Sequence, residues 1–268
     1  MNATTWTTKF RSRAERAASR PGPLWHCGAA GLVLLASGCA VAPSGQPARQ
    51  FRSAAIAHGY IPLQHNLYLL WEGVGAATVI APGIAATAAH NANLIDLHRV
   101  IGRSRRYDLM FFSTTQRGVP PLGEPRLGER VIAYGQGLSR TDLREATGVV
   151  RYTQADVLPR CPSCPVQQAF VYAAQGGKGF SGGPVVAATS GRIVGITFGF
   201  RNGLDDRHPK ARLMYAYAMK RVFRELKRVL ARAAKRQRTR DHATLSLALP
   251  QDKMLDLGSE HAPVRRKP

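Results

Sequence analysis

The central part of the chain alternates short apolar runs with turn residues. The runs are rich in valine, isoleucine, alanine and aromatic residues, and glycine, proline, asparagine or serine stands between many of them. Runs bounded in this way are typical of β-strands joined by short loops. They lie at 67–71, 73–80, 84–91, 107–112, 128–137, 145–152, 169–172, 185–188, 193–198 and 213–217. The pattern predicts an all-β domain, which we place at 56–236.

A different periodicity begins after the last predicted strand. Apolar residues recur there at helical spacing, namely Met219, Val222, Phe223, Leu226, Val229, Leu230 and Ala233. This stripe predicts a C-terminal helix with one apolar face. From about Gln237 the pattern is lost, and we expect residues 237–268 to form a basic, disordered tail.

The N-terminal part follows a third pattern. Residues 1–26 are polar and basic, and residues 28–38 form an uncharged, largely apolar run that ends at Cys39. This run is too short to span a bilayer as a mature helix, but it suits the apolar core of an export signal. The segment resembles a bacterial lipoprotein signal peptide, with Ala36 where these signals usually carry leucine.

The lipoprotein resemblance implies that residues 1–38 are removed and that Cys39 carries a lipid, which would anchor the protein to a membrane. Residues 39–55 are rich in proline, serine and glycine, and we expect them to be a flexible tether. Ala40 implies sorting to the outer membrane, with the domain on its periplasmic face. An ordinary signal cut after Ala40 or Ala42, and an anchor that is not cut, remain open alternatives.

The chain is strongly basic. Its 268 residues carry 38 Lys and Arg against 16 Asp and Glu, a formal net charge of +22. The basic residues are concentrated between Lys210 and Arg240, where Glu225 is the one acidic residue. A solvated basic face on the predicted helix explains this excess, and contact with a membrane surface or nucleic acid is the alternative. Because no recognised nucleic-acid motif accompanies the charge, we expect no nucleic-acid partner.

The first candidate for chemistry is Ser181, in the sequence Gly-Phe-Ser-Gly-Gly-Pro over 179–184. Glycines beside a serine permit a tight turn on which a nucleophile can approach a substrate backbone. The same turn can aim the N–H groups of Gly179 and Ser181 at one point, as an oxyanion hole requires. A glycine-rich hairpin is the plain alternative. The elbow of the α/β-hydrolases does not fit, because a helix must follow its serine and Pro184 is followed here by strand-like runs.

Two further motifs precede the serine. Thr87-Ala88-Ala89-His90 ends a predicted strand, and Asp108 enters the apolar run Tyr-Asp-Leu-Met-Phe-Phe. A buried aspartate is costly unless it is paired, and a histidine N–H is a fitting partner. Asp96, which lies between the two motifs, is the rival carboxylate.

The order His90, Asp108, Ser181 and the strand-like surroundings resemble the trypsin-like (chymotrypsin-fold) serine peptidases, especially the bacterial stress proteases. The resemblance covers about residues 60–234. It implies two packed antiparallel β-barrels with a C-terminal helix and an active site in the cleft between them. In the implied triad Ser181 attacks the substrate carbonyl, His90 carries the proton and Asp108 orients His90.

The same resemblance locates the substrate. It places Gln175 at the floor of the primary specificity pocket, and Thr197, Phe198 and Gly199 beside the substrate backbone. None of these residues is a carboxylate that could pair with a cation, which predicts cleavage after an uncharged residue.

Phe180 stands where digestive relatives have an aspartate that pairs with a newly cut N-terminus. A phenylalanine cannot make that ion pair. We therefore expect activity without a cut in the domain, and no effect of residues that precede Phe51.

The cysteines suggest no metal site. Cys27 leaves with the signal and Cys39 is the lipidation site, so that Cys161 and Cys164 remain. In an exported protein a small disulfide between them is the simplest outcome. A zinc site would need two more ligands, and no second C-x-x-C occurs. We expect neither a metal nor a cofactor.

These motifs predict an exported, lipid-anchored serine endopeptidase that acts on polypeptide substrates. The alternative from another class is a catalytically silent relative that serves as a binding or assembly protein of the cell envelope. The presence of all three reactive residue types counts against this alternative.

Overall fold

The structure is a computed structural model that describes residues 44–67, 71–137, 139, 141–158, 165–202 and 212–248. They belong to the second of the chain's two compact units, Ala42–Pro268. Several predictions therefore lie outside the described residues: the signal peptide at 1–38, the lipidation site Cys39, the disulfide between Cys161 and Cys164, and the tail beyond 248.

Five antiparallel strands form the N-terminal sheet, in the order β2-β3-β4-β6-β5. They are β2 (Tyr60–Leu67), β3 (Trp71–Ala81), β4 (Ile84–Thr87), β5 (Val100–Arg103) and β6 (Met110–Ser113). A short helix, α1 (Ala54–Gly59), leads into β2, and Ser53 caps it by accepting a hydrogen bond from the N–H of Ile56. Two 3₁₀ turns, η1 (Ala89–Leu94) and η2 (Leu97–Arg99), connect β4 to β5.

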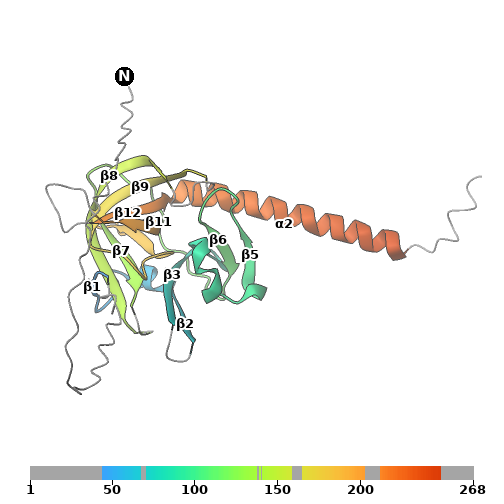
Figure 1. Ribbon diagram of the computed structural model, residues 1–268, viewed down its shortest axis with the longest axis horizontal. Helices are drawn as coiled ribbons and strands as arrows, with labels where there is room; N and C mark the ends of the chain where they lie inside the picture. The colour runs from blue at the N-terminus through green and yellow to red at the C-terminus, as the bar shows by residue number, and fades with distance from the viewer. Residues whose placement is uncertain are drawn as a thin grey trace, which may run out of the picture. The chain divides into compact units, whose positions relative to one another are not determined.

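The C-terminal strands close into a six-stranded barrel, because β8 pairs with β9 as well as with β7. They are β7 (Arg130–Gln136), β8 (Leu143–Val157), β9 (Gln167–Ala174), β10 (Pro184–Ala187), β11 (Ile193–Arg201) and β12 (Arg212–Ala218). A two-residue strand, β1 (Gln46–Pro47), pairs with β8 on the outside. Figure 1 shows the barrel beside the N-terminal sheet, whose edge strands β2 and β5 are not paired with each other in the described part of the chain.

The largest group of buried apolar side chains lies where the two sheets meet the C-terminal helix. It includes Ile80, Phe111, Tyr134, Ile196, Tyr217 and Val222. In β10 the side chains alternate, so that Val186 belongs to this group and its neighbours Val185 and Ala187 belong to a second group within the barrel. Both faces of β10 are therefore buried, which fixes the strand that follows Ser181.

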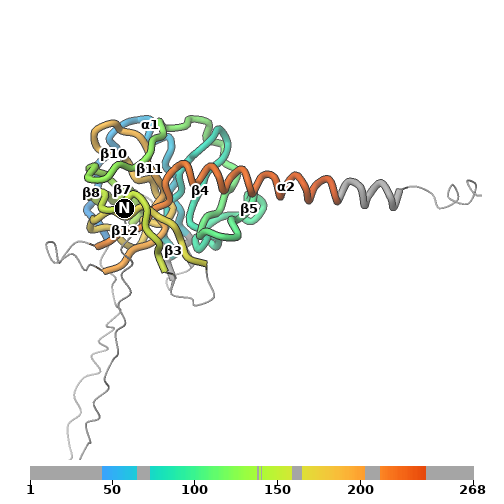
Figure 2. The backbone as a smooth tube through the Cα atoms, turned by 90° about the horizontal axis from the view of Figure 1, so that it is seen from above, coloured from blue at the N-terminus to red at the C-terminus, as the bar shows by residue number. Residues whose placement is uncertain are grey.

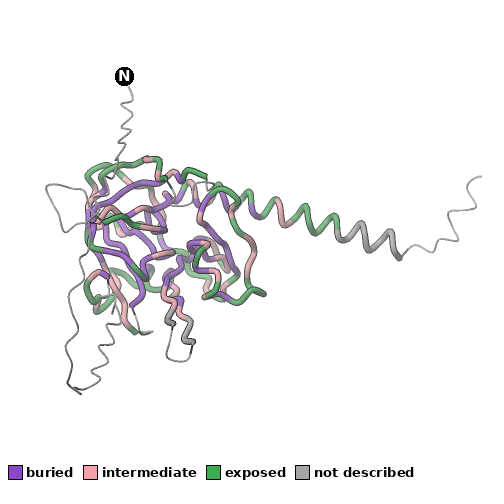
Figure 3. The backbone as a smooth tube through the Cα atoms, in the orientation of Figure 1, coloured by how far each residue is buried: buried purple, intermediate pink, exposed green. Residues whose placement is uncertain are grey.

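Helix α2 (Met219–Ala248) begins directly after β12. The carboxylate of Glu124 accepts a hydrogen bond from the N–H of Lys220 in its first turn, at 2.8 Å. The early turns bury one face of the helix through Met219, Val222, Leu226 and Val229. Later turns are mostly exposed (Figure 3). The helix continues past β5 in Figures 1 and 2. No helix among the described residues has the length and apolar character needed to span a membrane.

The predicted fold class, all-β with two antiparallel units and a C-terminal helix, is confirmed. The C-terminal unit is a barrel as predicted, whereas the N-terminal strands, predicted to form a second barrel, form a five-stranded sheet that is not closed within the described residues. The end of the helix needs correction, since α2 continues to Ala248 although its apolar pattern ends near Gln237. Residues 237–248 contain neither glycine nor proline, so nothing in them interrupts a helix before Pro250.

The flexible tether expected over 39–55 also needs correction in its described part. The chain joins the domain from Ser44 onward, because Ser44 is buried, β1 pairs with β8 and α1 follows. The ring of Phe51 lies 5.0 Å from that of Tyr134 and 5.1 Å from that of Tyr60. The proline, serine and glycine content of this segment predicted a flexible linker. Strand pairing with β8 and the ring contacts of Phe51 instead hold it against the domain.

Candidate active site

The nucleophile loop, residues 179–183, lies between β9 and β10 and touches both sheets. The N–H of Gly182 donates to the carbonyl of Thr197 in β11 at 2.7 Å. Gly182 has a φ of 86°, and a Cβ there would collide with the carbonyl oxygen of Ala76 and the hydroxyl of Thr87 in the N-terminal sheet. The loop requires glycine here because its backbone is in direct contact with the opposite sheet.

The carbonyl of Ser181 is hydrogen-bonded to β3 and to the turn that carries His90. It accepts hydrogen bonds from the N–H of Ala76 at 2.9 Å and from the side-chain amide of Asn91 at 2.8 Å. The buried amide of Asn91 also donates to the hydroxyl of Thr87, which donates to the carbonyl of Ala76. Asn91 follows His90 directly, so it fixes the histidine turn relative to the nucleophile. No pattern in the sequence indicated this role.

His90 contacts Asp108 through two atoms. Its Nδ1 lies 2.6 Å from Oδ2 of Asp108, and its backbone N–H donates to Oδ1 at 3.0 Å. The two side chains are 49% and 30% exposed, so solvent and substrate can reach the pair. Asp96 instead accepts a hydrogen bond from the N–H of His98 at the start of η2. Of the two candidate carboxylates, Asp108 is the one that reaches His90.

The barrel holds Asp108 in place. The N–H of Asp108 donates to the hydroxyl of Tyr217 in β12 at 3.0 Å and to Oε1 of Gln167 in β9 at 3.3 Å. The Tyr217 hydroxyl donates to the same Oε1 at 2.7 Å. Burial, together with the charge of Asp108, raises the pKa of Tyr217, so the phenol keeps the proton that it donates. No pattern in the sequence indicates a role for Tyr217 or Gln167, because neither lies in a motif.

The predicted oxyanion donors are available. The backbone N–H groups of Gly179 and Ser181 donate to no acceptor among the residues that the structure describes. The carbonyl of Gly179 accepts a hydrogen bond from the N–H of Gln136 at 3.0 Å, which fixes the adjoining peptide. Within the same described residues no hydrogen bond joins Ser181 to the His90 ring. Catalytic hydrogen bonds of this kind often tighten only when a substrate is bound.

Thr197 differs from its predicted role beside the substrate backbone. It is 1% exposed, and its hydroxyl lies 2.8 Å from that of Tyr172. Its N–H donates to the carbonyl of Gly183, and its carbonyl accepts from the N–H of Gly182. Both backbone groups therefore serve the nucleophile loop, and this buried residue offers no free N–H to a substrate strand.

The available edge of β11 begins one residue later. Pairing with β10 ends at Ile196, so residues 198–201 have no partner on that side within the described chain. Phe198 lies at a bulge opposite β12, and its ring stacks on that of Tyr217 at 4.1 Å. Phe198 and Gly199 are thus placed where an extended substrate could add as a strand. Gln175 is exposed, and its carbonyl accepts a hydrogen bond from the N–H of Gly45 at 2.9 Å.

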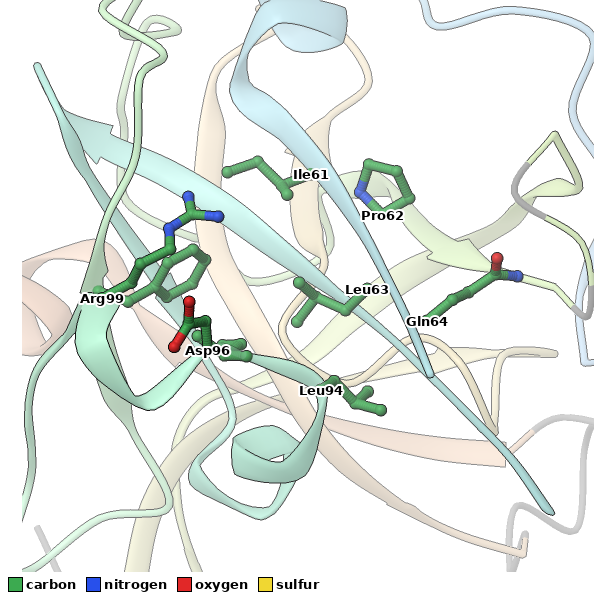
Figure 4. A pocket seen from close by; sticks show the side chains of 9 residues that line it. Ile61, Pro62, Leu63, Gln64, Leu94, Asp96 and Arg99 are labelled. Carbon is green, nitrogen blue, oxygen red and sulfur yellow. The ribbon is translucent and has the colours of Figure 1, made fainter. Parts of the chain in front are cut away.

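A separate pocket of about 250 Å³ opens between β2 and the 3₁₀ turns (Figure 4). It is lined by Ile61, Pro62, Leu63, Gln64, Leu94, Ile95, Asp96, Arg99 and Phe112. Asp96 belongs to this pocket, and none of the three candidate triad residues lines it. As for metals, the described residues contain no group of three or more His, Cys, Asp or Glu side chains that could hold an ion.

No family model matches the chain, and no curated protein matches its sequence. Its backbone matches solved serine proteases. The Rv3671c protease from M. tuberculosis, in its active form, superposes with a TM-score of 0.52 at 16% identity, covering 70% of this chain and 89% of that chain. The HtrA-type protease AlgW with a tripeptide gives 0.50 at 16% identity, covering 66% of this chain and 62% of that chain. The chain therefore has the fold of the trypsin-like serine proteases.

Proposed function

We propose that the chain is a serine endopeptidase whose catalytic triad is Ser181, His90 and Asp108, and that its substrates are polypeptides. The observation that carries this proposal is the two-atom contact between His90 and Asp108. That contact lies beside the nucleophile loop, whose Ser181 carbonyl accepts a hydrogen bond from Asn91, the residue that follows His90. The fold that the chain shares with serine proteases supports the same conclusion.

In this mechanism Ser181 Oγ attacks the scissile carbonyl carbon while His90 Nε2 takes the hydroxyl proton. The N–H groups of Gly179 and Ser181 bind the oxyanion that forms. His90 then donates the proton to the leaving amine as the carbon–nitrogen bond breaks. A water molecule, activated by the same ring, hydrolyses the acyl-enzyme. Asp108 keeps the proton on Nδ1 and stabilises the charged ring through its contact with that atom.

Labelling with a fluorophosphonate probe tests the proposal, because this reagent reacts with an activated serine. The full chain should be labelled, and Ser181→Ala should abolish labelling. Ser190→Ala, which changes an exposed serine in a nearby turn, should leave it intact. A folded wild-type chain that neither reacts with the probe nor cleaves unfolded casein would instead identify a catalytically silent relative.

We further propose that the enzyme prefers an uncharged residue before the scissile bond. No carboxylate lies at Gln175, Phe198 or Gly199, so a cationic side chain would find no ion-pair partner at these residues. A peptide-library cleavage profile measures this preference directly. A profile dominated by Arg or Lys at that position would overturn it.

We also propose that the protein is exported and anchored through a lipid on Cys39, at the periplasmic face of a bacterial outer membrane. The basic start, the apolar run over 28–38 and the cysteine that ends it support this proposal. Mass spectrometry of the N-terminus should find an acylated Cys39, and Cys39→Ala should lose the acyl chain. Unmodified protein cut after Ala42 would contradict the lipid anchor.

A further inference from the structure

The N-terminal segment, residues 44–48, follows the outer edge of β8. Gln46 and Pro47 pair with Glu145 and Arg144 of that strand, and the N–H of Ala48 donates to the carbonyl of Leu143 at 2.9 Å. Because the segment is paired along its length, its first residues are held in a definite position. They lie against the run 175–180, which leads into the nucleophile.

Gly45 touches both ends of the run 175–180. At one end its N–H donates to the carbonyl of Gln175 at 2.9 Å. At the other end Phe180 is 0% exposed, and a Cβ added to Gly45 would lie 2.7 Å from its Cζ. Gly179, which supplies one proposed oxyanion donor, lies within the run. Gly45 therefore contacts the residues at both ends of the run that carries this donor.

Arg212 makes a second connection between the segment and the run. Its Nη1 donates to the carbonyl of Gly176 at 2.9 Å and to the hydroxyl of Ser44 at 3.4 Å. Its guanidinium carbon lies 5.1 Å from the ring centre of Phe200 in β11, a cation–π contact that steadies the side chain. Ser44 is 9% exposed, so this connection is largely shielded from water.

The run needs such external contacts because of its composition. Three of its six residues are glycine, at 176, 177 and 179. Glycine populates many backbone conformations, so contacts with neighbouring segments help to order the run. An oxyanion donor must be in position before the reaction, since its value depends on avoiding reorganisation during the chemical step.

We propose that the N-terminal segment is a positioning element of the active site, which orders the run 175–180 and so aims the N–H of Gly179 at the oxyanion. The inference rests on the proposed serine-protease function. It reverses the expectation that residues preceding Phe51 are without effect. The uncut chain supplies the contact, and cleavage within residues 44–48 would lower activity.

Gly45→Ala in the full chain tests the inference. Gly45 has a φ of 73°, and the new Cβ would lie 2.7 Å from both Phe180 Cζ and the carbonyl oxygen of Glu145. The substitution should displace the segment and lower kcat roughly 10- to 100-fold, the scale of loss expected when a catalytic group is misplaced by about 1 Å. The loss in kcat should exceed any change in KM, because the oxyanion donor acts on the transition state, whereas Gln175 of the same run is the residue predicted to contribute to substrate binding.

Gly128→Ala is the matched control. Gly128 has a φ of 77°, yet no atom lies within 4 Å of the position its Cβ would take. Both variants carry the same backbone strain, and only one disturbs Phe180. If wild-type protein reacts fully with the fluorophosphonate probe but the two variants have equal kcat values, the inference is overturned and the proposed function stands. A wild-type chain without any reactivity would overturn the proposed function instead.

Hydrogen exchange of the wild-type chain provides a second test that requires no variant to fold. The amides of Gly45 and Ala48 donate to backbone carbonyls and should exchange slowly, like amides of the neighbouring β8. Exchange as fast as in an unfolded peptide would show that the segment is not docked, and would overturn the inference. This measurement does not depend on catalysis.

Discussion

Two aspartates lie close in sequence to His90, and their surroundings differ at the scale of single residues. Asp108 accepts from the backbone N–H of His90 and contacts its Nδ1, while its own N–H is held by Tyr217 and Gln167. Asp96 is exposed and accepts from the N–H of His98. One carboxylate can therefore orient the imidazole, and the other serves a local turn.

Asp108→Asn should lower kcat by roughly 10⁴-fold if the triad operates, because an amide cannot stabilise the charged imidazole or fix its tautomer. Asp96→Asn, the matched change, should leave kcat within a few-fold of wild type, since an asparagine also accepts at the start of a turn. Steady-state hydrolysis of a peptide substrate by both variants provides the comparison. A larger loss in the Asp96 variant would reverse the assignment.

At the scale of elements, α2 is attached to the N-terminal sheet through a buried carboxylate. Glu225 is 1% exposed, accepts a hydrogen bond from the hydroxyl of Ser104 at 2.7 Å and pairs with Arg228 one turn later in the helix. Arg232 donates to the carbonyl of Arg103 in β5 at 3.1 Å. These contacts hold the first half of α2 against the end of β5, and the apolar face of this half belongs to the core between the sheets.

Glu225→Ala should lower the free energy of unfolding by about 1–3 kcal/mol, because it removes hydrogen bonds to a buried charged group. Asp156→Ala is the control, since Asp156 is an exposed acid on β8 and should change the free energy by no more than about 0.5 kcal/mol. Denaturant unfolding monitored by circular dichroism measures both values. Equal effects would show that the buried carboxylate of Glu225 does not anchor α2.

At the scale of the whole molecule, the basic charge is concentrated on one element. Exposed cations of the later turns of α2 include Lys235, Arg236 and Arg238, and the one acid in the preceding turns, Glu225, is buried and paired. Such a surface attracts polyanions through a field that salt screens. The apolar stripe ends before these turns, so the interaction should be electrostatic and should not involve insertion into a membrane.

Replacing Lys235, Arg236 and Arg238 together by glutamine should lower the salt concentration at which the protein elutes from an anionic heparin matrix. A control variant with Arg117, Arg126 and Arg130 replaced by glutamine loses equal charge from exposed places on the body and should elute closer to wild type. The clustered set should matter more because neighbouring cations act on one polyanion together. Identical elution of the two variants would show that only net charge counts.

Much of the fold could be predicted from local patterns. Strand-like runs separated by turn residues identified the β domain, and the spacing of Met219, Val222, Leu226 and Val229 identified α2. These predictions hold because the two periodicities are local consequences of burying one face of a strand or helix. The end of α2 was misplaced, because a helix can continue through residues without an apolar stripe when no glycine or proline interrupts it.

The candidate reactive residues could be identified from sequence motifs alone. Ser181 stands in a motif whose glycines are required by close backbone contacts, and His90 ends a run of small residues, so the local sequence carries the signal for both. Only the folded chain shows which carboxylate meets His90, that Asn91 and Tyr217 hydrogen-bond within the site, and that the N-terminal segment reaches the nucleophile loop. The physical reason is distance along the chain: Asp108 and Tyr217 are 109 residues apart, and Arg212 and Ser44 are 168 apart. Contacts of this kind arise when two sheets close on each other, and no local pattern records them.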